Sequence, residues 1–170
     1  TNLDDALQMY TRYRNNLLGV ISDVGFTVHK GDSADMEKLD AGIDLVKHIK
    51  ADNEKMPILL QSSQDSISAV AKELGVGFLR KYSKTLMLQL SDYIKEEFGF
   101  GDFVFRDANH VEYGRAANLK ELEAIIREVP DEVLLYVTSK NMLSKWFMAR
   151  GLFTLGERFR SVLETQFGTV

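Results

Sequence analysis

Three residues of different chemistry follow three short apolar runs in this sequence. Asp23 ends the run Leu17-Leu18-Gly19-Val20-Ile21-Ser22-Asp23, Ser62 follows Ile58-Leu59-Leu60-Gln61, and Lys81 ends Gly77-Phe78-Leu79-Arg80-Lys81. Apolar runs of this length are typical of strands buried on both faces of a parallel sheet. Because open α/β folds carry their functional groups at the carboxyl ends of the strands, we expect Asp23, Ser62 and Lys81 to share one edge of the sheet.

A carboxylate, a hydroxyl and an ammonium group together suit phosphoryl transfer. Asp23 can act as a nucleophile that forms an acyl phosphate. Lys81 can pair with the phosphate as a point charge, and the Ser62 hydroxyl can donate to a phosphate oxygen. A structural alternative stays open, in which Lys81 and Asp23 form an ion pair, Ser62 caps the next helix, or Asp23 is a turn residue before Val24-Gly25.

The segments between these runs predict the elements that position them. Helical spacing of apolar residues favours helices over about 3–14, 40–52, 67–74 and 83–98. We expect Thr1 to cap the first helix, Asp65 or Ser66 to cap the third, and Gly75 and Gly99 to follow helix ends. Helices that alternate with strands predict a parallel sheet with right-handed crossovers. A long polar loop, about 24–38, separates the first strand from the second helix.

The sequence changes character after Gly99. Alternation over 102–113 predicts a small hairpin with His110 in its turn. A helix capped by Asn118 follows, then a helical run from Pro130 to Gly151, then a capping box at Thr154 and Glu157 for a last helix that includes Phe159, Val162 and Leu163. The predicted fold is therefore a flavodoxin-like α/β sheet with flanking helices over 1–98, and a hairpin with a helical module over 99–170.

Composition excludes several classes of function. The 170 residues contain no Cys, which excludes disulfides and thiolate metal sites, and His29, His48 and His110 show no metal-ligand spacing. No apolar run approaches the ~18 residues of a membrane span, and no signal peptide is apparent, so a cytoplasmic protein is expected. The chain begins at Thr1 without a Met, which is compatible with a piece of a longer protein.

A basic stretch surrounds Trp146 near the end of the sequence. Between 139 and 160 the only acidic residue is Glu157, whereas the basic residues are Lys140, Lys145, Arg150, Arg158 and Arg160. Such a face could bind nucleic acid. However, residues 101–170 carry 9 basic and 10 acidic side chains. We therefore favour a solvated face with Trp146 in the core.

Residues 1 to about 98 resemble the receiver domain of two-component response regulators, starting at its second helix. The resemblance lies in the run that ends at Asp23, in Ala41-Gly42-Ile43-Asp44-Leu45-Val46, in Pro57-Ile58-Leu59-Leu60-Gln61-Ser62-Ser63 and in Gly75-Val76-Gly77-Phe78-Leu79-Arg80-Lys81. It implies that Asp23 accepts a phosphoryl group from a histidine kinase or a small phosphodonor. It further implies that Ser62 and Lys81 engage the phosphate, and that Asp23 and the Gly25 carbonyl bind Mg²⁺.

The sequence departs from the receiver pattern in three places. The first strand, first helix and second strand of that family, with the acidic pair that holds Mg²⁺, would lie upstream of Thr1. The connection from Asp23 to Gly42 is about ten residues longer than usual, as surface loops allow. Tyr82 stands where the family has a proline after the lysine.

A second resemblance concerns the C-terminal part. Asn141, Ser144-Lys145-Trp146 and Ala149-Arg150-Gly151-Leu152-Phe153 are similar to a segment that precedes the nucleotide-binding part of bacterial proteins like phosphoenolpyruvate synthase or pyruvate, phosphate dikinase. It implies a regulatory fragment of a larger phosphotransferase, without that family's catalytic His.

The sequence therefore predicts a phosphorylation-responsive regulatory module. Its partners would be a phosphodonor and either another protein or the rest of the parent chain, and a dimer is left open. Two alternatives remain: a pseudo-receiver that only mediates protein contacts, and a fragment of a phosphoryl-transfer enzyme that uses Asp23 as its nucleophile.

Overall fold

The computed structural model describes residues 2–161, which divide into two compact units between Ser91 and Asp92. The division falls inside the helix α4 (Leu86–Glu97), a little before the boundary expected at residue 98. Within residues 2–161, no helix is long and apolar enough to span a membrane.

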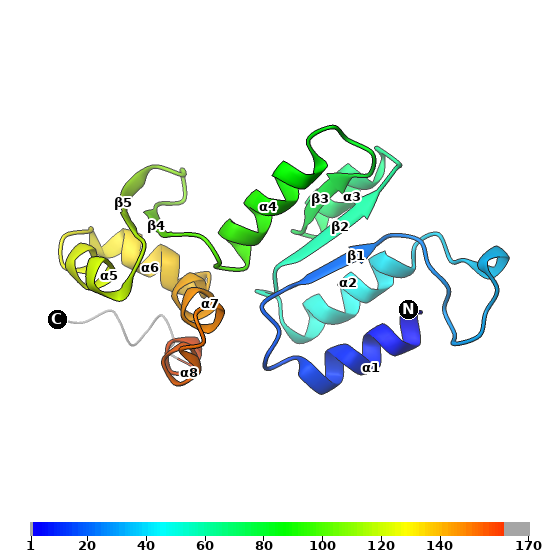
Figure 1. Ribbon diagram of the computed structural model, residues 1–170, viewed down its shortest axis with the longest axis horizontal. Helices are drawn as coiled ribbons and strands as arrows, with labels where there is room; N and C mark the ends of the chain where they lie inside the picture. The colour runs from blue at the N-terminus through cyan, green and yellow to red at the C-terminus, as the bar shows by residue number, and fades with distance from the viewer. Residues whose placement is uncertain (1, 162–170) are drawn as a thin grey trace. The chain divides into compact units, whose positions relative to one another are not determined.

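The first unit alternates helices and strands, as the sequence predicted (Figure 1). Its elements are α1 (Leu3–Tyr13), β1 (Val20–Asp23), α2 (Ala41–Asp52), β2 (Ile58–Ser62), α3 (Ile67–Glu73), β3 (Gly77–Arg80) and the start of α4. The strands form a parallel sheet in the order β1-β2-β3. A mixed α/β architecture with a parallel sheet is thus confirmed.

The central strand is β2, and β1 lies at an edge. In β2, Ile58, Leu59 and Leu60 are almost completely buried, as a strand paired on both sides requires. The prediction of a first strand buried on both faces, starting at Leu17, was wrong. β1 begins only at Val20, its residues alternate between half-buried and exposed, and Ile21 is 42% exposed. Its edge position leaves part of its surface without a neighbouring strand.

Three helices cover one face of this sheet. The core on that side contains Leu3 and Tyr10 from α1, together with side chains from α2, β2 and α3, namely Leu45, Val46, Ile49, Ile58, Leu60 and Ala71. The helices carry these residues at the spacing of one helical face. The sheet is thus held from one side by packing that reaches across all of its strands.

The first helix begins with an asparagine cap. The Asn2 side chain accepts a hydrogen bond from Asp5 N at 2.8 Å. The cap expected at Thr1 lies outside the described residues. Gly75 has φ 64° just after α3, and Gly99 has φ 81° just after α4, as expected for glycines that end helices.

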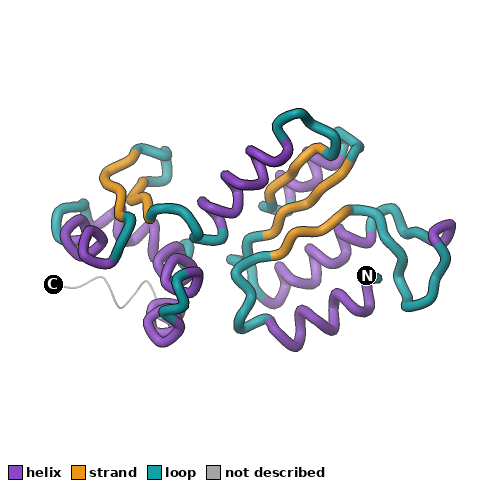
Figure 2. Tube along the Cα trace, viewed as in Figure 1, coloured by secondary structure: helices purple, strands orange, loops and turns teal. Residues whose placement is uncertain are grey.

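The second unit combines a hairpin with four short helices (Figure 2). The hairpin strands β4 (Phe103–Arg106) and β5 (Glu112–Ala116) are antiparallel, with a bulge at Phe105/Arg106. His110 has φ 64° in the connecting turn, as predicted. The helices are α5 (Leu119–Ile126), α6 (Asp131–Ser139), α7 (Met142–Ala149) and α8 (Phe153–Ser161).

Two predictions about these helices were wrong. The run from Pro130 to Gly151 is two helices rather than one, because Asn141 takes the left-handed conformation (φ 55°), which a continuous α-helix cannot contain. The last helix begins at Phe153, so Thr154 lies in its first turn and does not cap it. The expected continuation through Val162 and Leu163 lies outside the described residues.

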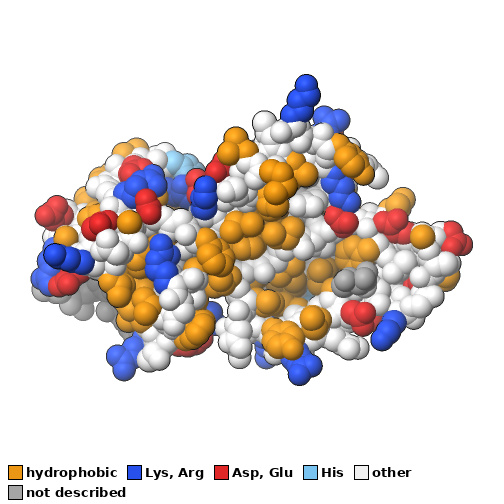
Figure 3. Space-filling model, in the orientation of Figure 1, with side chains coloured by type: hydrophobic (Ala, Val, Ile, Leu, Met, Phe, Trp, Pro, Cys, Tyr) orange, Lys and Arg blue, Asp and Glu red, His pale blue; other side chains and the backbone are white. Residues whose placement is uncertain are grey.

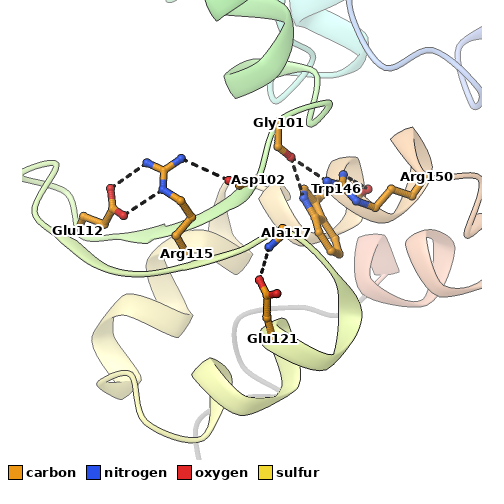
Figure 4. A network of polar contacts seen from close by, with 8 residues as sticks. All are labelled: Gly101, Asp102, Glu112, Arg115, Ala117, Glu121, Trp146 and Arg150. Carbon is orange, nitrogen blue, oxygen red and sulfur yellow. Dashed lines mark hydrogen bonds and ion pairs between the residues drawn. The ribbon is translucent and has the colours of Figure 1, made fainter.

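Trp146 is a core residue, as the sequence favoured. Its ring is 1% exposed and stacks edge-on against Phe103 and Phe147. Its Nε1 donates to Gly101 O at 3.0 Å (Figure 4). The Arg150 guanidinium lies 3.6 Å from the Trp146 ring centroid and donates to Gly99 O and Gly101 O at 2.9 and 2.8 Å. Arg150 thereby fastens α7 to the segment that leads into the hairpin.

Tyr10 joins α1 to the end of α2. Its hydroxyl donates to Asp52 Oδ2 at 2.7 Å, and Arg14 pairs with the other oxygen of that carboxylate at 2.9 Å. Burial, with the hydrogen bond to Asp52, raises the pKa of Tyr10 to about 12. The folded state therefore favours the neutral phenol.

We expect Tyr10→Phe to lower the free energy of unfolding by about 1 kcal/mol, because the Asp52 carboxylate loses a donor. We also expect the wild type to lose stability as the pH rises from about 10 to about 12, because Tyr10 ionises at a lower pH in the unfolded chain than in the folded one. Urea unfolding across this pH range checks both. Tyr13→Phe, at an exposed position, is the control and should keep the full alkaline loss.

Replacing Arg150 by Lys tests how much this residue stabilises the contact between α7 and the segment before the hairpin. We expect a loss of about 2 kcal/mol in the second unit, because an ammonium group cannot donate to both carbonyls while it stacks on the ring. Urea unfolding followed by the fluorescence of Trp146, the one tryptophan of the chain, measures it. Arg127→Lys is the matched control, since Arg127 only pairs with Glu123 on an exposed helix surface. Equal effects of the two changes would contradict this role.

Candidate functional site

The carboxyl ends of the three parallel strands meet at one edge of the first unit. In the register of the sheet, Asp23 pairs with Gln61, and Ser62 pairs with Arg80. Lys81 comes directly after β3, and its backbone N donates to Ser62 O at 2.9 Å. The three residues predicted from the sequence therefore end neighbouring strands.

Asp23 and Lys81 are in direct contact. Lys81 Nζ lies 3.0 Å from Asp23 Oδ1, although β2 separates their strands. Two strands with a third strand between them lie about 10 Å apart. The Lys81 side chain must therefore extend across β2 to reach the Asp23 carboxylate. The Asp23 side chain is 48% exposed and that of Lys81 33% exposed. A soluble reactant can thus reach the carboxylate, and solvent screening keeps the ion pair weak.

Ser62 lies at the same edge, but its hydroxyl is engaged elsewhere. The residue is 8% exposed, and its Oγ accepts a hydrogen bond from Gln64 N at 3.1 Å. This contact stabilises the turn between β2 and α3. Ser62 therefore does not cap α3, which begins at Ile67, although its hydroxyl has a structural role. The structure therefore brings together Asp23 and Lys81, whereas the Ser62 hydroxyl faces the turn.

The start of α2 presses against the backbone that follows Asp23. Gly42 N donates to Val24 O at 2.7 Å. A Cβ added at Gly42 would lie 2.1 Å from Asp23 O and 2.9 Å from the Val24 Cα, closer than side-chain carbons approach. Glycine at this position thus allows the first turn of α2 to pack directly against the backbone at the end of β1. A glycine within the first turn of a predicted helix was the signal that could have identified this contact.

The long loop after Asp23 is tied down at its base. Phe26 and Lys38 form an isolated antiparallel bridge, and Lys38 Nζ contacts Asp44 Oδ2. Leu3 N donates to Thr27 O at 2.9 Å. His29 Nδ1 lies 2.7 Å from Asp4 Oδ2, and this hydrogen bond raises the pKa of His29. The loop that follows Asp23 is therefore anchored to the start of α1 and to α2.

A second ion pair lies near this edge and was not predicted. Arg80 Nε lies 3.2 Å from Asp65 Oδ1, with both side chains more exposed than the Asp23–Lys81 pair. Arg80 and Lys81 are consecutive, and each pairs with a carboxylate from a different segment. Asp65 therefore provides a natural comparison for Asp23.

The oxygen donors implied for Mg²⁺ form an incomplete set. Asp23 contributes an exposed carboxylate, and Gly25 contributes a backbone carbonyl two residues later. In the part of the chain that the structure describes, no group of three or more His, Cys, Asp or Glu residues is placed to hold a metal ion. Mg²⁺ commonly binds through one or two carboxylates and keeps several waters, but two donors alone do not make such a site.

Comparison with known proteins gives no relative. No protein-family model matches the chain, and neither a curated protein nor a solved structure matches it.

We expect Gly42→Ala to destabilise the first unit by about 2 kcal/mol, because its Cβ forces α2 away from the Asp23 carbonyl. Helix propensity alone predicts the opposite sign, by up to ~1 kcal/mol. Urea unfolding gives the sign, and amide hydrogen exchange at 23–25 reports whether the strand end loosens. A more stable variant would contradict the close contact.

Proposed function

We propose that this chain is a signal-receiver module in which Asp23 accepts a phosphoryl group. The observation that supports it best is the 3.0 Å contact between Asp23 and Lys81 at the carboxyl edge of a parallel sheet. An exposed carboxylate beside a fixed ammonium group is suited to bind and then hold a phosphoryl group. The finer assignment of a flavodoxin-like receiver fold is part of this proposal.

The chemical step is a displacement at phosphorus. A carboxylate oxygen of Asp23 attacks the phosphorus of a histidine kinase phosphohistidine or of a small phosphodonor. The bond from phosphorus to the donor breaks, and the donor leaves with the bonding electrons. The product is an acyl phosphate, which carries more negative charge than the carboxylate did. The Lys81 ammonium then pairs with phosphoryl oxygens in place of Asp23 Oδ1.

Mg²⁺ belongs to this proposal only as an ion that Asp23 and the Gly25 carbonyl would help to hold. When bound, such an ion neutralises charge on the transferring phosphoryl group. Lys81, which contacts Asp23, can neutralise part of the charge of the phosphoryl group whether or not the ion is bound.

The change in the pairing of Lys81 can affect the protein surface through the residue that follows it. Tyr82, the next residue, has φ 65° and is 91% exposed. A tyrosine in the left-handed region is strained, and such strain is found in segments that change conformation. We infer that phosphorylation biases the turn from Tyr82 to Thr85, where Ser83 and Thr85 hydroxyls bond to each other at 3.0 Å.

The second unit would carry the response to a larger phosphotransferase. The residues that resemble such a protein include Ser144, Trp146 and Arg150. In the structure all three have structural roles. Trp146 lies in the core, Arg150 donates to Gly99 O and Gly101 O, and Ser144 Oγ donates to Gly156 O at 2.8 Å. The proposal therefore assigns this unit an organising role and no catalysis.

Intact mass spectrometry after incubation with acetyl phosphate and Mg²⁺ tests the phosphoacceptor. We expect the wild type to gain the mass of one phosphoryl group and Asp23→Asn to gain none. Asp65→Asn is the matched control and should be modified like the wild type, because Asp65 pairs with Arg80 outside the proposed site.

Three results would overturn the proposal. An unmodified wild-type chain would favour a module that only mediates protein contacts. A label that persists in Asp23→Asn would place the chemistry elsewhere. Steady hydrolysis of a phosphomonoester by the chain, lost in Asp23→Asn, would instead favour a phosphoryl-transfer enzyme.

A further inference from the structure

The last two residues of β2 project from opposite faces of the sheet. Side chains alternate between the two faces along a strand. Ile58 and Leu60 pack in the core formed with α1, α2 and α3, so Ser62 projects toward this helix-covered face. Leu59 and Gln61 therefore project from the second face, which the side chains of these three helices do not cover.

Asp23 projects from the same second face as Gln61. Val20 and Val24 pack in the helix-covered core, so Ile21 and Asp23 point the other way. Asp23 is also the register partner of Gln61, on a strand about 4.8 Å away. Ile21 is 42% exposed, so this second face is incompletely covered among residues 2–161. Figure 3 shows hydrophobic side chains at the surface of the first unit, as incomplete cover produces.

This alternation explains why the Ser62 hydroxyl does not reach the Asp23 carboxylate. It lies on the helix-covered side, where it accepts a hydrogen bond from Gln64 N at 3.1 Å. The polar side chain that β2 presents beside Asp23 is instead Gln61, which is half-buried. Among residues 2–161 its amide has no hydrogen-bond partner. An amide of this kind offers two donor hydrogens and an acceptor oxygen.

Gln61 lies between the two members of the Asp23–Lys81 pair. It is the register partner of Asp23 on one side and of Leu79 on the other. Lys81 crosses β2 to place its Nζ 3.0 Å from Asp23 Oδ1. A glutamine side chain is one methylene longer than that of aspartate. The Gln61 amide can therefore extend beyond the carboxylate, to the level at which a phosphoryl group on Asp23 would stand.

We propose that the Gln61 amide donates a hydrogen bond to a phosphoryl oxygen during transfer to Asp23, in the role that the receiver resemblance gives to the Ser62 hydroxyl. This inference rests on the proposed function. The bond from Asp23 to phosphorus forms and the bond to the donor breaks as described above, and Gln61 exchanges no proton. Its amide shares with the Lys81 ammonium the negative charge that develops on the phosphoryl oxygens.

The initial rate of phosphoryl transfer from acetyl phosphate, in the presence of Mg²⁺, tests the role of Gln61. Intact mass spectrometry at successive times measures it. We expect Gln61→Leu to slow transfer about tenfold, because leucine is similar in size but has no donor. Gln61→Asn keeps an amide on a shorter stem and should transfer at an intermediate rate. Gln64→Leu is the matched control, since the same change at an exposed position of the turn should leave the rate unchanged.

Ser62→Ala separates the two faces of β2. The serine hydroxyl stabilises the turn, so this variant should lose stability in urea. Its rate of transfer should fall much less than that of Gln61→Leu. Urea unfolding of Gln61→Leu is expected to match the wild type, because leucine suits a half-buried strand position. Slower transfer in that variant would then reflect the lost donor rather than a loosened fold.

The possible failures are distinguishable. An unchanged rate in both Gln61 variants, with the wild type modified at Asp23, would overturn this inference and leave the proposed function intact. A larger loss of rate in Ser62→Ala than in Gln61→Leu would also overturn it, because the serine would then carry the role. A wild type that acetyl phosphate does not modify would overturn this inference together with the proposed function.

Discussion

Parallel pairing of β2 with both of its neighbours is the constraint on which the first unit depends. β2 is buried on both faces, and its register with β1 and β3 brings the three carboxyl ends to one level. Only in that register does the lysine stem from the end of β3 reach the carboxylate at the end of β1. A shift of one residue would turn the Asp23 side chain to the other face of the sheet. The ion pair is therefore a result of strand pairing and contributes little to it.

The ladder that β1 forms with β2 fixes the position of Asp23. Val20 N donates to Pro57 O at 3.0 Å and Val24 N donates to Gln61 O at 3.2 Å, so the backbone is bonded to β2 both before and after Asp23. The Asp23 side chain is 48% exposed. One short strand thus combines a backbone held by pairing with a carboxylate that solvent can reach.

The sequence was sufficient to predict the alternation of helices and strands and most of their positions, because apolar spacing and turn residues are local signals. It correctly placed Asp23, Ser62 and Lys81 at strand ends. It could not show that β1 is an edge strand, since strand order depends on pairing between distant segments. The direction of the Ser62 hydroxyl depends on the turn that follows, and the break at Asn141 depends on one backbone conformation that apolar periodicity does not report. The contact of Gly42 with the Asp23 carbonyl depends on how α2 docks, which is a tertiary property.

The bridge between Phe26 and Lys38 separates the base of the long loop from its tip. The base is tied to α1 and α2, so it shares the rigidity of the unit. Beyond the bridge, Thr27 and His29 still contact the start of α1, so the tip is the segment around Gly31, which has φ 96°. The entropy of closing a loop grows slowly with its length, so residues could be gained or lost at the tip with little effect on folding. The sequence and length of this tip can therefore vary, in evolution or by design, for example to bind a partner or to carry a label. Asp23 would keep its place in the register of β1 with β2.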